Sequence, residues 1–175
     1  MFSSPSQNIS SLDLQSGMAV ADLGSGSGHY ALAAARAVGD KGKIYAIDVQ
    51  KELLEKLKKE ADRNRLFNVQ IIWGNAEKIG GTKLKDECAD AAIVGNILFQ
   101  IEDEESFVAE IRRILKKRGR MLVVEWQDSF GGIGPHPKAV FSKAKTEALF
   151  LKSGFSLERE IEAGEHHYGL IFRKN

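Results

Sequence analysis

Hydrophobic residues along this chain form short continuous runs that alternate with stretches in which apolar positions recur every three or four residues. The short runs predict buried strands at 18–23, 43–48, 69–73, 89–94 and 121–125. The periodic stretches predict helices at 29–38, 51–66 and 103–115, and a last helix that carries Phe141, Ala144, Ala148 and Leu151 and ends at Gly154. Such alternation requires right-handed crossovers and a mostly parallel sheet that is covered on both faces.

The C-terminal part has a different pattern. Residues 156–161 and 168–173 read as two strands joined by a short turn, which predicts an antiparallel hairpin and one reversed strand at an edge of the sheet. The expected fold is therefore α/β, with a three-layer, seven-stranded, mostly parallel sheet and an antiparallel C-terminal hairpin strand. We expect a single domain over residues 1–175, in which residues 1–14 form a loose N-terminal segment.

Composition excludes several classes of protein. No apolar run approaches the roughly 20 residues that a membrane-spanning helix needs. The polar N-terminus lacks the pattern of a secretory signal, so we expect a cytoplasmic protein. A net charge of +1 provides no general attraction to nucleic acid, and Cys88, as the single cysteine, excludes an intrachain disulfide.

A glycine-rich turn joins the first predicted strand to the first predicted helix, with the sequence Asp22-Leu23-Gly24-Ser25-Gly26-Ser27-Gly28. Three glycines let the backbone approach a ligand closely, and the helix that follows offers free N–H groups to an anion. The spacing differs from the Gly-x-Gly-x-x-Gly of dinucleotide sites, which disfavours NAD. Asp22 adds a carboxylate that suits an ammonium group, so the turn is better matched to an amino-acid zwitterion than to pyrophosphate.

Polar residues also follow the next two predicted strands. Asp48 ends the second strand, where its carboxylate suits the two hydroxyl groups of a ribose. Asn75 and Ala76 follow the third strand, where a side-chain carbonyl and a backbone amide suit the edge of an adenine ring. Because the carboxyl ends of parallel strands meet at one edge of the sheet, we expect a nucleoside site there.

Taken together, the segments at 20–28, 46–48, 74–77 and 89–96 resemble the class I S-adenosylmethionine-dependent methyltransferases, over the chain from about residue 15 to its end. The chain is most similar to the small-molecule branch that includes the ubiquinone and menaquinone C-methyltransferases, since Leu-Lys-Lys-Arg-Gly-Arg at 115–120 stands where those enzymes have a glycine-containing turn. The resemblance implies a Rossmann-like fold and S-adenosyl-L-methionine as the cofactor.

The resemblance also implies roles for individual positions. The methionine part of the cofactor is expected on the glycine turn, the ribose on Asp48, the adenine beside Val49 and Ala76, and the methyl-transfer site above Gly95 and Asn96. Asn75 stands where the family commonly has an Asp, and it keeps an acceptor for the adenine amino group. The residues implied for cofactor binding are Asp22, Gly24, Ser25, Gly26, Gly28, Asp48, Val49, Asn75, Ala76, Gly95 and Asn96.

Methyl transfer requires no nucleophilic side chain of the protein, so any acid–base residue would serve the acceptor. Asn96, Glu125 and His136 are the polar residues near strand ends, and they are the candidate catalytic residues. His136 lies in a Gly- and Pro-rich loop over 127–137, and it is equally well explained as a solvated loop residue. His166 and His167 are neighbours on a strand and have no third ligand, which predicts no metal site.

The acceptor stays open at this stage. A small molecule is favoured, but fewer than 20 residues precede the first strand, which predicts an open pocket. An open pocket suits a protein or RNA acceptor, or closure by the 127–137 loop or a second subunit, and the oligomeric state is undetermined. The basic run at 116–120 reads as a solvated helix end. A catalytically silent cofactor-binding protein and a nucleotide-dependent oxidoreductase are the alternative functions.

Overall fold

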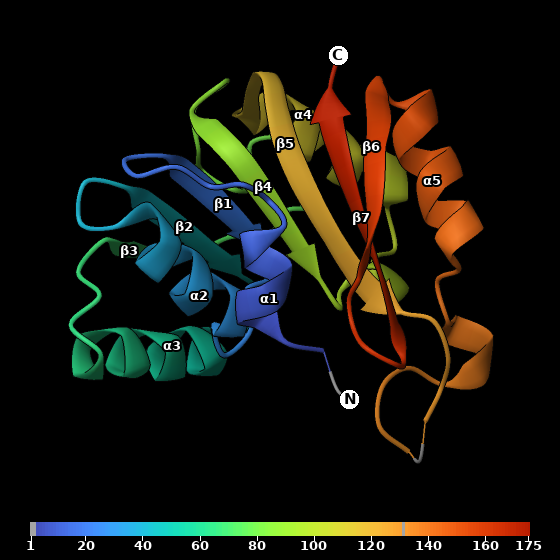
Figure 1. Cartoon of the computed structure of the whole chain (residues 1–175), viewed down its shortest axis with the longest axis horizontal. Helices are drawn as coiled ribbons and strands as arrows, with labels where there is room; N and C mark the ends of the chain where they lie inside the picture. Colours follow the sequence, from blue (N-terminus) through green and yellow to red (C-terminus); the bar gives the residue numbers. More distant parts are fainter. Residues whose placement is uncertain (1–2, 131) are drawn as a thin grey trace.

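A computed structural model describes residues 3–130 and 132–175 (Figure 1). The strands are β1 (Ala19–Leu23), β2 (Lys43–Asp48), β3 (Val69–Trp73), β4 (Ala89–Gly95), β5 (Leu115–Trp126), β6 (Phe155–Glu162) and β7 (His167–Lys174). The helices are α1 (Pro5–Ser10), α2 (His29–Val38), α3 (Lys51–Arg63), α4 (Glu104–Ile114) and α5 (Lys143–Lys152), with short 3-10 helices η1 (Leu98–Gln100) and η2 (Pro137–Ala139). The strands form one sheet in the order β3-β2-β1-β4-β5-β7-β6.

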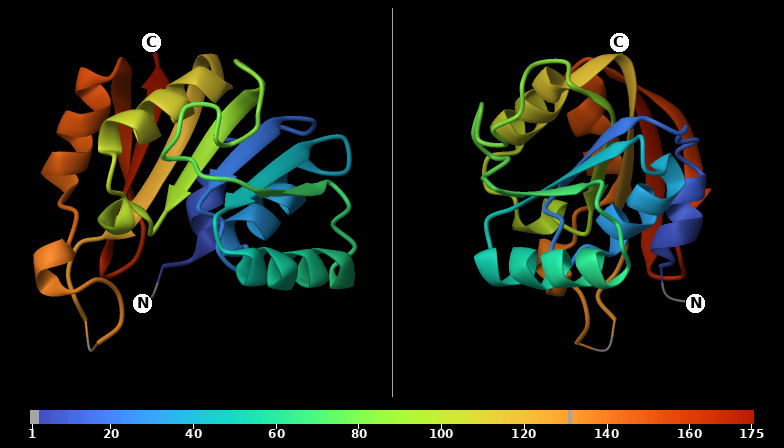
Figure 2. Two further views of the ribbon diagram at one scale, coloured as in Figure 1. Left: turned by 180° about the vertical axis from the view of Figure 1, so that it is seen from behind. Right: turned by 90° about the vertical axis from the view of Figure 1, so that its left-hand side faces the viewer.

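Helices cover both faces of the sheet, as the two further views show (Figure 2). Residues of α1, α2 and α3 pack on one face with the apolar side chains of β1, β2 and β4 that point toward them. Residues of η1, α4 and α5 pack on the other face. The pairs from β3 through β5 are parallel, and β7 is antiparallel to both of its neighbours. The three-layer α/β fold predicted from the sequence is therefore confirmed.

The order of the strands reverses between β1 and β4. From β1 the chain moves outward through β2 to β3, and it then returns to the other side of β1 to build β4 and β5. Crossovers that leave in opposite directions separate at this point and open a crevice beyond the carboxyl ends of the strands. The glycine turn after β1 and the segment after β4 therefore line the same opening.

The C-terminal hairpin differs from the prediction in one respect. β7, the reversed strand, lies between β5 and β6 and not at the edge of the sheet. Its first six residues are all buried, whereas β6 exposes much of its length as the edge strand. The run from Tyr168 to Phe172 is the most apolar part of the hairpin, and pairing on both sides buries it more fully than an edge position does.

The basic run at 116–120 is not a helix end, contrary to the interpretation from sequence. α4 ends at Ile114 and β5 begins at once, so Gly119 lies within the strand and does not stop the helix. Lys116 forms an ion pair with Asp90 at 2.6 Å, and Arg120 forms one with Glu158 at 2.9 Å. These two ion pairs join the basic run to carboxylates on other segments, and local sequence signals did not reveal such contacts.

α5 buries a different face from the one predicted. Ala144, Ala148 and Leu151 are exposed, whereas Thr146, Leu149 and Phe150 are buried. Thr146 hydrogen-bonds the Tyr168 hydroxyl at 2.6 Å, and this hydroxyl donates to the carbonyl of Phe141. Phe141 precedes the helix, so counting a helical period from it selected the wrong face.

The N-terminal segment is not loose over its described part. Residues 5–10 form α1, in which Asn8 and Ile9 are buried against α2. The amide nitrogen of the Asn8 side chain donates to the Tyr30 hydroxyl at 2.9 Å. Short polar stretches carry little periodicity, so this helix depends on its packing and not on its own sequence. Among residues 3–130 and 132–175, no helix is long and apolar enough to cross a membrane.

Candidate functional site

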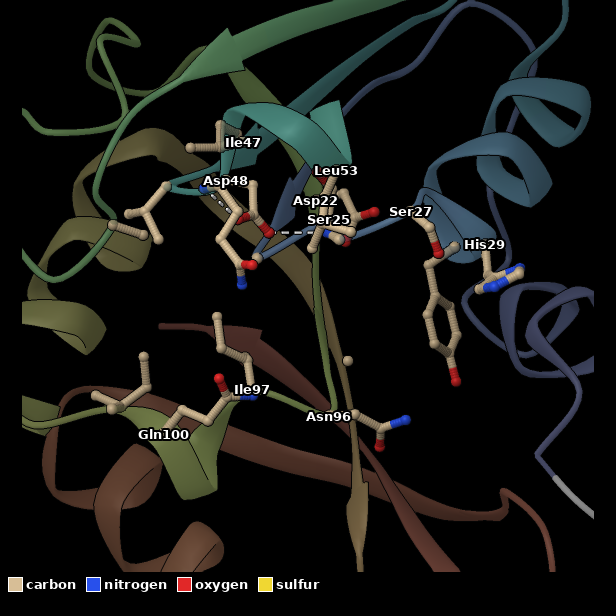
Figure 3. Close-up of a pocket in the computed structure, with 18 of the residues that line it drawn as sticks. Asp22, Ser25, Ser27, His29, Ile47, Asp48, Leu53, Asn96, Ile97 and Gln100 are labelled. Atoms are coloured by element: carbon tan, nitrogen blue, oxygen red, sulfur yellow. Dashed lines mark hydrogen bonds between the residues drawn. The ribbon is translucent and has the colours of Figure 1, made fainter. Parts of the chain in front are cut away.

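A cavity of about 750 Å³ lies at the carboxyl ends of β1, β2 and β4 (Figure 3). Asp22, Ser25 and Asp48 gather beside the glycine turn, while Asn96, Ile97 and Gln100 lie across the cavity from them. A cavity of this size suits a ligand of cofactor dimensions. The predicted site residues that line it are Asp22, Gly24, Ser25, Gly26, Asp48, Val49, Asn75, Ala76, Gly95 and Asn96.

Glycine stands at each of the three positions of the turn for a different structural reason. All three have positive φ angles. A Cβ atom at Gly24 would lie 2.0 Å from the Cδ1 atom of Ile97, and one at Gly28 would lie 2.4 Å from the Cγ atom of Leu57. A Cβ at Gly26 would meet nothing within 4 Å. Gly24 and Gly28 therefore permit close packing of the protein itself, whereas Gly26 leaves space on the cavity side; Gly28 does not line the cavity.

Asp22 is 2% exposed and has one carboxylate oxygen, Oδ2, without a hydrogen-bond partner among the described residues. Burial, with a smaller contribution from the nearby charge of Asp48, raises its pKa to about 7 against the opposing effect of a hydrogen bond from the Ala31 amide. A buried carboxylate without a countercharge is costly. The position therefore favours a cationic group in the cavity.

Asp48 is positioned by backbone amides. Its Oδ2 atom accepts from Gly26 N at 2.9 Å, and its Oδ1 atom accepts from Gln50 N at 2.8 Å. Each carboxylate oxygen retains a further lone pair. The side chain thus ties the glycine turn to the end of β2 and presents two fixed acceptors to the cavity.

The segment after β3 forms the next part of the wall. The Asn75 Oδ1 atom accepts from Glu77 N at 2.8 Å, so its side chain stabilises the local turn. The sequence analysis expected this same Oδ1 atom to accept a hydrogen bond from an adenine amino group. In the structure it already accepts one hydrogen bond, from Glu77 N. Ala76 is buried, and Val49, on the opposite segment, is 55% exposed.

Other buried polar atoms line the cavity without a partner among the described residues, and the Ser25 hydroxyl and the Asn96 Oδ1 atom are two of them. Asn96 has a φ of 54° and donates its backbone N–H to Val124 O at 2.8 Å. A buried polar atom costs free energy until it gains a partner. Both atoms therefore provide hydrogen-bonding capacity for a ligand.

The other candidate catalytic residues do not line the cavity. Glu125 is fully buried, and it accepts from Leu98 N at 2.7 Å and from Trp126 N at 2.8 Å. Burial raises its pKa to about 7 despite these hydrogen bonds. Glu125 thus holds η1, which carries one wall of the cavity. His136 is exposed and accepts from Lys138 N, which makes it a cap of η2.

Sequence reasoning missed the aromatic residues that line the cavity, among them Tyr30, Trp126 and His167. His167 is 6% exposed, and its ring centroid lies 4.2 Å from that of Trp126, its partner in the register of β5 and β7. No local signal reveals this contact, because it depends on how two distant strands pair. Within residues 3–130 and 132–175, no cluster of three or more His, Cys, Asp or Glu residues is arranged to hold a metal ion.

Comparisons with known proteins find similarity to methyltransferases. The family model described as "Methyltransferase domain" matches residues 14–163. A demethylmenaquinone methyltransferase from Geobacillus sp. (strain WCH70) is 28% identical over 114 residues, which cover 65% of this chain and 47% of that protein. The arsenite methyltransferase of Homo sapiens is 31% identical over 108 residues, covering 58% of this chain and 29% of that protein. The chain thus spans about half or less of the length of these curated relatives.

A solved structure is similar over nearly the whole chain. The crystal structure of an S-adenosylmethionine-dependent methyltransferase from Aquifex aeolicus superimposes with a TM-score of 0.90 at 26% sequence identity. The similarity covers 99% of this chain and 91% of that one. It includes α1 and the C-terminal hairpin, the two regions that the sequence analysis described least well.

Proposed function

The chain belongs to the methyltransferase-domain family, and on that premise we propose that it is an S-adenosylmethionine-dependent methyltransferase. The observation that carries the proposal is the buried Asp22 Oδ2 atom, which has no partner among the described residues and lies in the same cavity as the glycine turn. One group suits an ammonium and the other suits a carboxylate. Together they match the amino-acid end of S-adenosylmethionine, and a pyrophosphate would bring only negative charge toward Asp22.

The residues present fit this cofactor at its methionine end. Asp22 Oδ2 would receive the ammonium group, and the Ser25 hydroxyl and the free amides at the start of α2 would receive the carboxylate. The open space beside Gly26 leaves room for the ligand to approach the backbone. Gly24 and Gly28 contribute indirectly, because they allow Ile97 and Leu57 to pack closely against the turn.

The nucleoside end fits the other segments. Asp48 would accept hydrogen bonds from both ribose hydroxyls with the lone pairs that the backbone leaves free. Val49 and Ala76 would contact the faces of the adenine ring, with Asn75 at its edge. Gly95 and Asn96 would lie beneath the methyl group, across the cavity from the glycine turn.

S-adenosylmethionine, when bound, supplies a methyl group that its sulfonium centre already activates. The protein therefore contributes orientation of the acceptor and exclusion of water, effects worth about 7–11 kcal/mol when alignment is complete. Glu125 supports this role indirectly, because it fixes η1 and the wall that carries Asn96 and Ile97. A small-molecule acceptor and a cytoplasmic location stay predictions from sequence, as does a single domain over the whole chain.

Calorimetry tests the proposal. We expect the purified chain to bind S-adenosylmethionine and its demethylated product, S-adenosylhomocysteine, with about micromolar affinity, and to bind neither NAD nor NADP. No binding of either methionine-derived ligand would exclude the proposal. Asp48→Asn should weaken binding of both, whereas Asp40→Asn, an exposed aspartate in the turn after α2, is the matched control and should not.

A second measurement separates an enzyme from a silent binding protein. Candidate acceptors are incubated with the protein and with cofactor that carries an isotope-labelled methyl group, and the label is followed into each acceptor. Transfer above the rate without protein supports the enzyme. Binding without transfer to any acceptor class would favour the silent protein.

A further inference from the structure

His167 occupies an unusual position at the start of β7. It lines the main cavity, and it also lines a second cavity of about 570 Å³ between α1 and the β6–β7 hairpin. Figure 2 shows α1 beside this hairpin. The second cavity is lined by Gln7 and Asn8 on one side and by residues around Gly164 on the other. His167 therefore stands where the two cavities meet.

The hydrogen-bonding capacity of His167 is unused. Its side chain is 6% exposed, and neither Nδ1 nor Nε2 has a partner among the described residues. Its neighbour His166 differs: it hydrogen-bonds Asp128 at 2.9 Å, stacks on Phe130 and lines neither cavity. A phenylalanine would pack on Trp126 equally well without leaving two buried nitrogens unpaired. Contacts within the protein therefore do not explain why residue 167 is a histidine.

Two atoms that line the cavity and have no partner among the described residues, Asn96 Oδ1 and one ring nitrogen of His167, can accept a hydrogen bond from a donor on the ligand. Asn96 Oδ1 accepts only, and a neutral imidazole has one accepting nitrogen. Burial lowers the pKa of His167, as does the neighbouring His166, although Asp128 opposes them. The ring is therefore neutral near pH 7 and keeps its accepting nitrogen. Trp126 adds a flat apolar face beside it.

We propose that His167, with Asn96 and Trp126, forms the methyl-acceptor site, and that this site takes a flat acceptor with an O–H or N–H group on its ring. This inference rests on the methyltransferase function proposed above. The acceptor enters through the second cavity and reaches the main cavity beside His167. A carbon or thiolate acceptor, which brings no such proton, would leave the accepting atoms of Asn96 and His167 unpaired.

The transfer step balances with this arrangement. The acceptor heteroatom forms a bond to the methyl carbon as the carbon–sulfur bond breaks, and the electron pair of that bond stays on sulfur. The proton of the acceptor moves to the free ring nitrogen of His167. The imidazolium then loses the proton to solvent through the second cavity, which restores the neutral ring.

The experiment uses two pairs of small aromatic probes. Para-cresol carries an O–H and benzimidazole carries a ring N–H, and para-methylanisole and N-methylbenzimidazole are their methylated counterparts. Each probe is titrated into the full chain with and without saturating S-adenosylhomocysteine. We expect the wild type to bind at least one proton-bearing probe about tenfold more tightly than its methylated counterpart. The probe that shows the preference identifies the class of heteroatom.

Variants at neighbouring positions provide the controls. His167→Phe keeps the ring that packs on Trp126 and should abolish the tenfold preference while leaving the affinity for S-adenosylhomocysteine within about twofold. His166→Phe changes the adjacent histidine and should leave both unchanged. Nitrogen NMR of the labelled histidines supplies a readout that packing alone does not affect: the His167 ring signals, assigned by their loss in His167→Phe, should shift when the preferred probe binds.

Each outcome decides a separate point. If neither proton-bearing probe is preferred by the wild type, or if His167→Phe retains the preference, the acceptor site proposed here is wrong. If the wild type binds the probes with this preference but does not bind S-adenosylhomocysteine, the proposed function fails while the site around His167 stands.

Discussion

Asp22 and Glu110 are both buried acidic residues, but they differ in their hydrogen-bond donors, in their cationic partners and in the direction in which their pKa is shifted. Glu110, on α4, accepts from Arg113 through two nitrogens at 2.8 Å, and also from Thr82 and from Gly80 N. Burial alone raises its pKa, yet these hydrogen bonds outweigh burial and lower it to about 2. Asp22 has no cationic partner within residues 3–130 and 132–175, and burial raises its pKa to about 7.

The difference matches a structural role for the Glu110 carboxylate and the ligand-binding role proposed for that of Asp22. Glu110 connects α4 to the segment between β3 and β4, which has no regular secondary structure and needs such an anchor. Asp22 is the penultimate residue of β1 and lines the cavity, and its Oδ2 atom has no hydrogen-bond partner among the described residues. Substitutions at Glu110 should therefore affect folding, and those at Asp22 should affect binding.

The largest expected effect is at Glu110. Glu110→Ala leaves Arg113 without its main partner, and breaking a buried ion pair from one side costs about 3–5 kcal/mol in free energy of unfolding. Urea denaturation measures this loss. Glu105→Ala, on the same helix with an exposed side chain, should change stability by less than about 0.5 kcal/mol. If Glu110→Ala lowers the free energy of unfolding no more than Glu105→Ala does, Glu110 does not have the structural role inferred here.

The pH dependence of stability should be opposite for the two residues. Because its folded pKa is raised, Asp22 holds its proton in the folded state above pH 4, so its contribution to stability falls as pH rises from about 4 to 7. Glu110 has a lowered pKa, so its contribution is present above its ordinary pKa of 4.5 and is lost as pH falls toward 2.

Denaturation at several pH values tests this contrast without ligand. Between pH 4 and 7, wild type should lose about 3 kcal/mol relative to Asp22→Asn, since the pKa is raised from 3.8 to about 7 and each unit titrated over this range is worth about 1.4 kcal/mol. Saturating S-adenosylhomocysteine should reduce this difference, because its ammonium stabilises the charged carboxylate. Parallel pH profiles of stability for wild type and Asp22→Asn would show that folding does not raise the pKa of Asp22.

Ligand affinity should respond to Asp22 and not to Glu110. Asp22→Asn keeps the size of the side chain but removes the charge that would face the ammonium, so the affinity for S-adenosylhomocysteine should fall at least about tenfold, or about 1.4 kcal/mol. The free energy of unfolding at pH 7 should stay equal or rise. Calorimetry with Glu110→Gln, under conditions where it is folded, is the matched measurement and should show wild-type affinity.

The smallest expected effects concern two buried hydroxyls. Thr82→Val removes a donor to Glu110 and should lower the free energy of unfolding by about 1–2 kcal/mol without changing ligand affinity. Ser25→Ala removes a hydroxyl that has no partner among the described residues, so stability should change by less than about 0.5 kcal/mol while ligand affinity falls a few-fold. Equal effects of the two substitutions on stability would contradict the distinction.

Much of this site could be predicted from the sequence because its signals are local. The bounds of α2, β2 and β3 agree with the apolar pattern residue for residue. The turn from Gly24 to Gly28 requires positive φ angles that glycine adopts readily, and Asp22 and Asp48 follow from their places at strand ends. In parallel strands, such places converge without any knowledge of side-chain packing.

The sequence by itself determined the class of fold and the glycine turn that lines the cavity, since short-range periodicity and the spacing of the glycines specify them. Only the tertiary structure decided that α1 packs beside Tyr30, that β7 lies inside the sheet, and that His167 pairs with Trp126. It also distinguished Glu125, held by Leu98 N, from a residue that faces the cavity. Each of these depends on contacts between segments far apart along the chain, where strand register and burial, not local sequence, fix the position of a side chain.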